Sequence, residues 1–175
     1  MNKIFCCVQV IDVGTQAHTK AGKIAHRREI LFAWERVDPT IDSAAKPMVV
    51  YKCYGMNLGQ DSSLRKDLEQ LLSTQNPNWF QRFTPKSLLG KYCVVTLASQ
   101  PENLSSICVT RVKALKADID PSKLPKPITP FGIFMISEPD IDLFERLPQD
   151  IRQKISLSPE WDYRANGAND YDRFF

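Results

Sequence analysis

Three segments with the alternating pattern of β-strands carry basic and aromatic residues on one face. Segment by segment, the residues that share a face are Arg28, Phe32, Trp34 and Arg36; Lys52 and Tyr54; and Arg111 and Lys113. Cations neutralise phosphates and aromatic rings stack on bases, and single-stranded nucleic acid requires both of a protein surface. The pattern therefore predicts a nucleic-acid-binding face made of strands.

Further cations accompany these segments. Lys20 and Lys23 lie in or beside the polar stretch TQAHTKAGK, which predicts a loop, and Lys91 begins a later apolar run. The predicted nucleic-acid-binding set is Lys20, Lys23, Arg28, Trp34, Arg36, Lys52, Tyr54, Lys91, Arg111 and Lys113. Two alternatives stay open: the apolar run around Phe32 and Trp34 also suits the core, and the loop cations also suit a solvated edge.

The elements that would position these residues come in a defined order. Alternating runs at about 3–13, 25–37 and 47–58 predict three strands, and runs at about 91–98 and 105–115 predict two more. Between the third and fourth lies a predicted helix, Ser62 to Leu72, whose apolar stripe is Leu64, Leu68, Leu71 and Leu72. This is the order of the OB-fold, a five-stranded Greek-key barrel that binds oligonucleotides. The predicted fold is thus mainly β, with the helix closing one end of an OB-fold-like barrel.

The domain organisation follows from changes in composition. Residues 1–116 form the predicted barrel, and residues 117–157 a proline-rich extension with a short helix that packs on it. The apolar residues expected to hold this extension are Phe131, Ile133, Phe134, Ile136, Leu147, Ile151 and Ile155. Residues 158–175 are polar with little periodicity, and we expect a mobile tail there.

Charge separates the body of the chain from its C-terminal part. The net charge of the 175 residues is +3, yet residues 137–175 hold nine acidic and five basic residues, so the remainder is basic. The tail residues Asp170, Tyr171, Asp172, Phe174 and Phe175 predict a peptide that docks into partner proteins. An ordinary frayed end is the alternative.

Several classes of function lack support in the sequence. The chain has none of the serine-hydrolase, phosphate-loop, zinc-protease or dinucleotide motifs, so we expect no enzymatic activity and no cofactor. Five cysteines without C-x-x-C spacing indicate reduced, buried thiols rather than a metal site. No apolar run approaches the roughly 20 residues of a membrane-spanning helix, and we expect a cytoplasmic protein.

Five segments together resemble a family. They are VIDVGTQ (Val10–Gln16), REILFAWE (Arg28–Glu35), SSLRKDLEQLL (Ser62–Leu72), LLGKYCVVTL (Leu88–Leu97) and LPQDIRQKI (Leu147–Ile155). In order and spacing they are similar to small bacteriophage and prophage proteins of replication and recombination cassettes, which are regarded as OB-fold-like candidates for single-stranded DNA binding. The resemblance implies a DNA-handling role in a bacterial host and no catalytic residues. The tail separately resembles the tips of bacterial and phage single-strand-binding proteins, although Arg173 departs from their acidic pattern.

These observations favour a single-stranded DNA-binding protein without sequence preference, acting in replication or recombination, with replication or recombination proteins as partners of the tail. The alternative is a protein-interaction module on the same barrel, such as a recombination accessory or an inhibitor of a host factor, because a fold does not decide a function. The preference for DNA over RNA and the oligomeric state, a dimer included, stay open.

Overall fold

The computed structural model describes residues 3–37, 47–72, 80, 82–100 and 103–161. Its strands are β1 (Lys3–Lys20), β2 (Lys23–Arg36), β3 (Val49–Gly55), β4 (Tyr92–Gln100), β5 (Asn103–Lys113) and β6 (Gly132–Phe134). Its helices are α1 (Ser63–Leu72), α3 (Ile141–Arg146) and α4 (Gln149–Ser156), with short 3₁₀ turns η1 (Pro85–Leu88) and η2 (Pro121–Lys123). The mainly β class and the helix between the third and fourth strands are confirmed.

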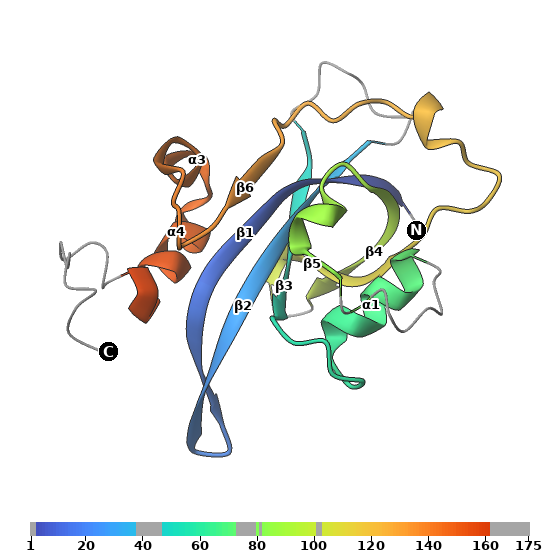
Figure 1. Ribbon diagram of the computed structural model, residues 1–175. Helices are drawn as coiled ribbons and strands as arrows, with labels where there is room; N and C mark the ends of the chain where they lie inside the picture. Colours follow the sequence, from blue (N-terminus) through green and yellow to red (C-terminus); the bar gives the residue numbers. More distant parts are fainter. Residues whose placement is uncertain (1–2, 38–46, 73–79, 81, 101–102, 162–175) are drawn as a thin grey trace.

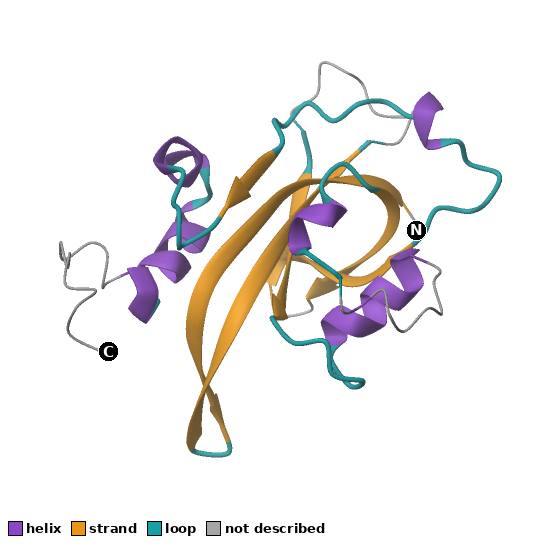
Figure 2. Ribbon diagram, viewed as in Figure 1, coloured by secondary structure: helices purple, strands orange, loops and turns teal. Residues whose placement is uncertain are grey.

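The strands form one six-stranded sheet in the order β3-β2-β1-β4-β5 (Figures 1 and 2). Neighbours in this order are antiparallel, whereas β6 pairs with β1 in parallel, from Gln9–Gly132 to Ile11–Phe134. The sequence predicted five strands and missed β6, because three residues give too short a pattern. At the ends of the order, β3 and β5 lie against each other, and Lys52 Nζ donates to the backbone oxygen of Thr110 at 3.0 Å.

The β1–β2 hairpin is longer than predicted. The stretch expected to be a loop continues both strands, and backbone pairing runs from Thr15–Arg28 to Lys20–Lys23. Ala21 and Gly22 form the turn with φ angles of 50° and 74°, as a tight hairpin turn with two left-handed residues requires. We call the projecting part of this hairpin, residues 15–28, the ribbon. Its polar sequence carries no apolar alternation, since a two-stranded arm in solvent has no apolar face, and the sequence pattern therefore did not predict it. Figure 1 shows it projecting from the body of the molecule.

An inner core fills the space between the curved sheet and α1. Phe5, Cys7, Phe32 and Trp34 contribute to it from β1 and β2, and α1 adds Leu64, Leu68 and Leu71. Burying a leucine stabilises a fold by about 1.5–3 kcal/mol, so the predicted stripe accounts for the position of α1. Ser62 caps the helix by accepting a 3.1 Å hydrogen bond from the Arg65 N–H.

An outer core lies on the opposite face of β1 and β2. Ile11, Val13 and Leu31 pack there against the C-terminal extension, which contributes Phe134, Ile136, Leu143, Leu147, Ile151 and Ile155. Figure 1 shows α3 and α4 on the far side of the sheet from α1. Of the residues expected to hold the extension, Phe131 and Ile133 are exposed rather than anchoring.

The segment after α4 also packs against β1. Ser158 is fully buried, and Glu160 accepts hydrogen bonds from the Thr15 N–H at 3.0 Å and the Thr15 hydroxyl at 2.6 Å. Gly14 has a φ of 71°, and a Cβ there would lie 2.7 Å from Ser158 and Ile136. Only glycine therefore permits this approach. Residues 158–161 thus belong to the packed extension, whereas the tail was expected to begin at residue 158.

Candidate nucleic-acid interface

The two aromatic rings predicted to stack on bases lie inside the protein. Trp34 is 1% exposed and Tyr54 is 3% exposed, and both belong to the inner core. Phe32, between them, has its ring centroid 5.7 Å from that of Tyr54 and 6.3 Å from that of Trp34. The prediction for Trp34 and Tyr54 is wrong because their strand face is turned toward α1, and the core alternative was the correct one for Phe32 and Trp34.

Tyr54 and Lys52 hold α1 in place. The Tyr54 hydroxyl donates to Asp67 Oδ2 at 2.6 Å, and Lys52 Nζ donates to the same oxygen at 2.5 Å. Burial and the neighbouring Asp67 carboxylate raise the pKa of the Tyr54 phenol far above its ordinary value. The charge of Lys52 is therefore neutralised within the fold and is not available to a phosphate.

Arg28 is likewise paired. Its Nη2 donates to Asp12 Oδ2 at 2.6 Å, and Asp12 is fully buried while its other oxygen accepts from the Gly14 N–H. This hydrogen bond raises the pKa of the Arg28 guanidinium above its ordinary value. The role of Arg28 is thus to compensate a buried carboxylate, which is costly to leave unpaired.

The remaining predicted cations lie at different places. Lys23 is exposed near the tip of the ribbon, Lys91 is exposed just before β4, and Arg36 is half-buried at the end of β2. The side chain of Lys20 and the tail residues Asp170, Tyr171, Asp172, Phe174 and Phe175 lie outside the described residues. The structure therefore does not bring the predicted set together on one surface.

The outer face of β2 and β3 is covered by the extension. Glu35, 2% exposed, accepts 2.7 Å hydrogen bonds from the Ile128 and Thr129 N–H groups. Glu29, in the middle of β2, accepts from Lys154 Nζ of α4 at 2.7 Å. Both buried carboxylates are thus occupied by groups of the chain itself.

Glu29 is the most highly connected of these carboxylates. Arg27 and the Cys53 thiol also donate to it, and His18 Nε2 lies 2.9 Å from Glu29 Oε1. Burial by itself would raise the pKa of Glu29, but the hydrogen bonds from Lys154, Arg27 and Cys53 lower it to about 2. The cluster joins the base of the ribbon to α4.

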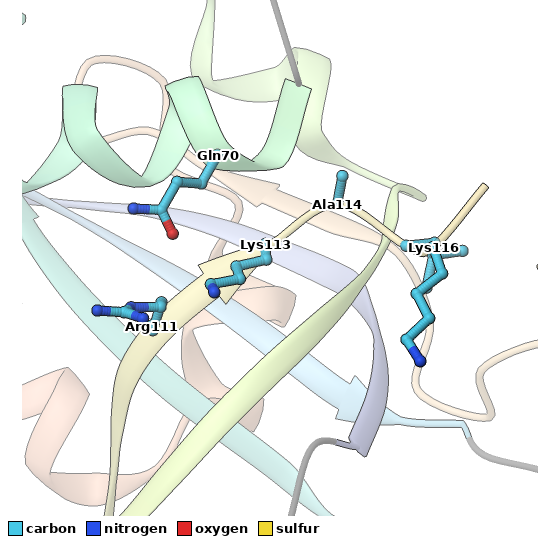
Figure 3. Close-up of a pocket in the computed structure, with 6 residues that line it drawn as sticks. Gln70, Arg111, Lys113, Ala114 and Lys116 are labelled. Carbon is cyan, nitrogen blue, oxygen red and sulfur yellow. The ribbon is translucent and has the colours of Figure 1, made fainter.

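A basic surface lies where β5 ends beside the C-terminus of α1. Arg111, Lys113 and Lys116, all exposed, line a shallow depression of about 480 Å³ together with Gln70, Ala114 and Leu115. We call these three cations the basic surface. Figure 3 shows Arg111 and Lys113 extending in the same direction beneath Gln70, while Lys116 points away from them.

The position of the basic surface follows from the backbone. The Ala114 N–H donates to the Gln70 backbone oxygen at 3.0 Å, which fixes the end of β5 against α1. Among the residues that the structure describes, Arg111, Lys113 and Lys116 have no carboxylate partner, in contrast to Lys52 and Arg28. Sequence reasoning included Arg111 and Lys113 but missed Lys116, although the basic run RVKALK was a usable signal.

Comparison of the chain with protein-family models, curated proteins and solved structures finds no match. What the chain binds is therefore to be inferred from its side chains and their geometry.

The described residues hold no group of three or more histidine, cysteine or acidic side chains arranged to bind a metal ion. Within the same ranges, no helix has the length and apolarity needed to span a membrane. All five cysteines are free thiols, and burial raises the pKa of Cys6 to about 12. Cys53 is exposed, which corrects the expectation that every cysteine is buried.

Proposed function

We propose that this chain is a single-stranded DNA-binding protein built on an OB-fold barrel. The element order supports this fold: three strands, α1 and two further strands, arranged as β3-β2-β1-β4-β5 with β3 lying against β5. An OB-fold has this pattern, and such barrels bind oligonucleotides without a catalytic step or cofactor. β6, α3 and α4 are an addition to the barrel.

The observation that carries the proposal is the unpaired charge of the basic surface. Three exposed cations line one depression, and no described carboxylate neutralises them. Their phosphate-binding capacity is free, whereas that of Lys52 and Arg28 is used internally. These free charges support a binding site on β5 and the segment after it, rather than on the covered face of β2 and β3.

The biological setting we propose is DNA replication or recombination in the cytoplasm of a bacterial host. Binding through phosphates has little sequence preference, as a protein that protects single strands requires. Partner proteins recruited by the tail belong to the same proposal.

A titration tests the function directly. A fluorescently labelled 20-nucleotide single strand is titrated with the protein at several salt concentrations, beside the duplex of the same sequence and the RNA strand. We expect binding at micromolar protein or below that weakens as salt rises, because phosphate neutralisation releases counterions. No binding at micromolar protein in low salt would contradict the proposal.

A second candidate, a protein-interaction module, is favoured by a different observation. Ile128, Phe131, Ile133 and Ile141 of the extension are exposed although they are large and apolar. Exposed apolar side chains of this kind contribute to protein interfaces when they lie together. Capture of host proteins by the intact chain but not by a Phe131→Ser, Ile133→Ser variant, with no DNA binding by either, would favour this candidate.

A further inference from the structure

A second cavity, of about 170 Å³, lies between β1, β6 and α3. Its lining includes Gln9, Thr129, Phe131, Leu143 and Arg146. The cavity far exceeds the roughly 10–15 Å³ that one water needs, and it is smaller than the roughly 300–1,000 Å³ of a pocket for drug-sized ligands. Its size suits one planar ring system.

The pocket lies where β1 changes its partner. Cys6 pairs with Tyr92 of β4, and the Cys7 backbone exchanges hydrogen bonds with Gly90 and Lys91. Two residues later Gln9 pairs with Gly132 of β6. A β-bulge between Cys7 and Gln9 interrupts the pairing of β1 with β2 here, and bulges commonly re-aim a side chain beside a functional site. Figure 1 shows β6 and β4 lying along different parts of β1.

The Gln9 carboxamide is the unusual group in this pocket. Gln9 is only 9% exposed, and within the described residues its side chain has no hydrogen-bond partner. Its carboxamide is not among the buried side-chain atoms that lack a hydrogen-bond partner, so solvent reaches it through the pocket. It lies on a face that continues into the apolar side chain of Ile11. The carboxamide is thus free to bind a ligand that enters the pocket.

The other lining groups define the chemistry of that ligand. Phe131 is 54% exposed and offers an aromatic ring at the wall. Arg146 Nε donates to the Asp142 backbone oxygen at 2.9 Å, and none of the described carboxylates forms an ion pair with its guanidinium. Phe131 also comes close to Gly90, the neighbour of the exposed Lys91. The pocket lining thus combines one aromatic ring, the Gln9 carboxamide, the Arg146 guanidinium and the carboxylate of Asp140, whose Oδ1 accepts from the Leu143 N–H at 2.9 Å.

We propose that this pocket holds one nucleobase, either from a bound single strand or from a free nucleotide; the strand-bound case rests on the proposed function. A carboxamide offers a donor and an acceptor side by side, as base edges require, and a phenyl ring offers a stacking surface. Arg146, which lines the pocket, is placed to meet an attached phosphate. An apolar side chain of a protein partner fits less well, because it would leave the Gln9 amide unpaired.

The test compares an intact 20-nucleotide thymidine strand with a strand of the same length in which every base is absent. The ratio of the two affinities isolates base contacts, because the phosphates are the same. The variants are Gln9→Leu and Phe131→Ala, with Gln153→Leu on the exposed side of α4 as the matched control. We expect each pocket variant to lower affinity for the intact strand roughly tenfold and to leave the abasic strand unaffected. Gln153→Leu changes neither, and an unchanged ratio in both pocket variants overturns the proposal.

Two further measurements separate this proposal from the proposed function. In the Arg111→Ala, Lys113→Ala variant we expect both the intact and the abasic strand to bind more weakly, and the ratio of the two affinities to stay the same. If the wild type binds neither strand, the proposed function fails. The Gln9 side-chain amide signals are then followed by NMR as thymidine and adenosine monophosphates are added.

Saturable shifts upon nucleotide addition support the pocket on their own. Absence of such shifts overturns it, as do shifts produced only by a phenylalanine-containing peptide. Chemical denaturation checks the fold: Gln9→Leu leaves stability unchanged or raises it, because the amide has no hydrogen-bond partner among the described residues and only its contact with solvent is lost. A marked loss of stability in Gln9→Leu would indicate that the amide has a hydrogen-bond partner within the protein, and would count against the proposal.

Discussion

The phenol of Tyr54, on β3, donates a 2.6 Å hydrogen bond to the carboxylate of Asp67, on α1. Lys52, two residues earlier on the same strand, donates to the same carboxylate oxygen at 2.5 Å. The sequence predicted that Tyr54 would stack on a base and that Lys52 would bind a phosphate. In the structure both side chains instead hydrogen-bond to the same residue of α1. Their joint task is to hold α1 over the inner core.

The Tyr54–Asp67 contact predicts a loss of stability without a loss of the proposed DNA binding. Tyr54→Phe leaves Asp67 with Lys52 alone and should lower the free energy of unfolding by roughly 1–3 kcal/mol. Urea denaturation measures this change. Tyr51→Phe is the control, since no described residue hydrogen-bonds to its hydroxyl. A stable Tyr54→Phe variant with weakened DNA binding would contradict this assignment.

The basic surface predicts the salt dependence of the proposed DNA binding. Replacing Arg111 and Lys113 by alanine should reduce the slope of log affinity against log salt by about 0.7 for each lost phosphate contact with a single strand. Fluorescence anisotropy at four or more salt concentrations gives the slope. Lys86→Ala, at an exposed cation of η1, should leave the slope unchanged. Equal slopes for the wild type and the double variant would place the DNA elsewhere.

Glu29 predicts a pH-dependent part of the stability. Its pKa falls from 4.5 to about 2 in the folded chain, where hydrogen bonds outweigh the effect of burial. The folded state then binds fewer protons than the unfolded state between these values. The contribution is complete above about pH 4.5 and is lost as pH falls through about 2.

The measurement is urea denaturation between pH 7 and pH 2 for the wild type and Glu29→Gln. The variant should be less stable at pH 7, and the two stability curves should converge toward pH 2, because the wild-type carboxyl is then becoming neutral too. Glu145→Gln, at an exposed position of α3, serves as the control. Parallel curves for the wild type and Glu29→Gln would show that the cluster does not titrate as described.

Glu35 predicts how the extension is held. Its two oxygens accept from the Ile128 and Thr129 N–H groups, both at 2.7 Å. Glu35→Gln replaces one acceptor oxygen by an NH₂ group, which cannot accept a hydrogen bond. Hydrogen exchange at these two amides should accelerate, while the amides of β4 stay protected. Unchanged exchange at Ile128 and Thr129 would mean that other contacts hold this segment.

Local pattern was sufficient where an element buries one face against a single neighbour. The leucine stripe predicted α1 and its buried side, and the spacing of Leu147, Ile151 and Ile155 predicted the face of α4 that enters the outer core. The turn between β4 and β5 predicted their hairpin. In each case the residues that specify the element are close together in the chain, so a short window contains the whole signal.

A short window of sequence does not predict which face of β2 is buried. Phe32 and Trp34 on one face and Leu31 and Ala33 on the other are all buried, because α1 covers one side and the extension covers the other. Alternation then no longer distinguishes a core face from an open face. The sequence therefore permitted the prediction that Trp34 lies on an open binding face, whereas both faces of β2 are covered in the structure.

By itself, the sequence determined the mainly β class, the place of α1 and the basic character of β5. Only the tertiary structure decided which cations are free. Arg28 pairs with Asp12, Lys52 with Asp67 and Lys154 with Glu29, partners 16, 15 and 125 residues apart. Charge neutralisation depends on distances in space, which folding sets and chain spacing does not. Arg111, Lys113 and Lys116 differ from those cations only in what the folded chain places beside them.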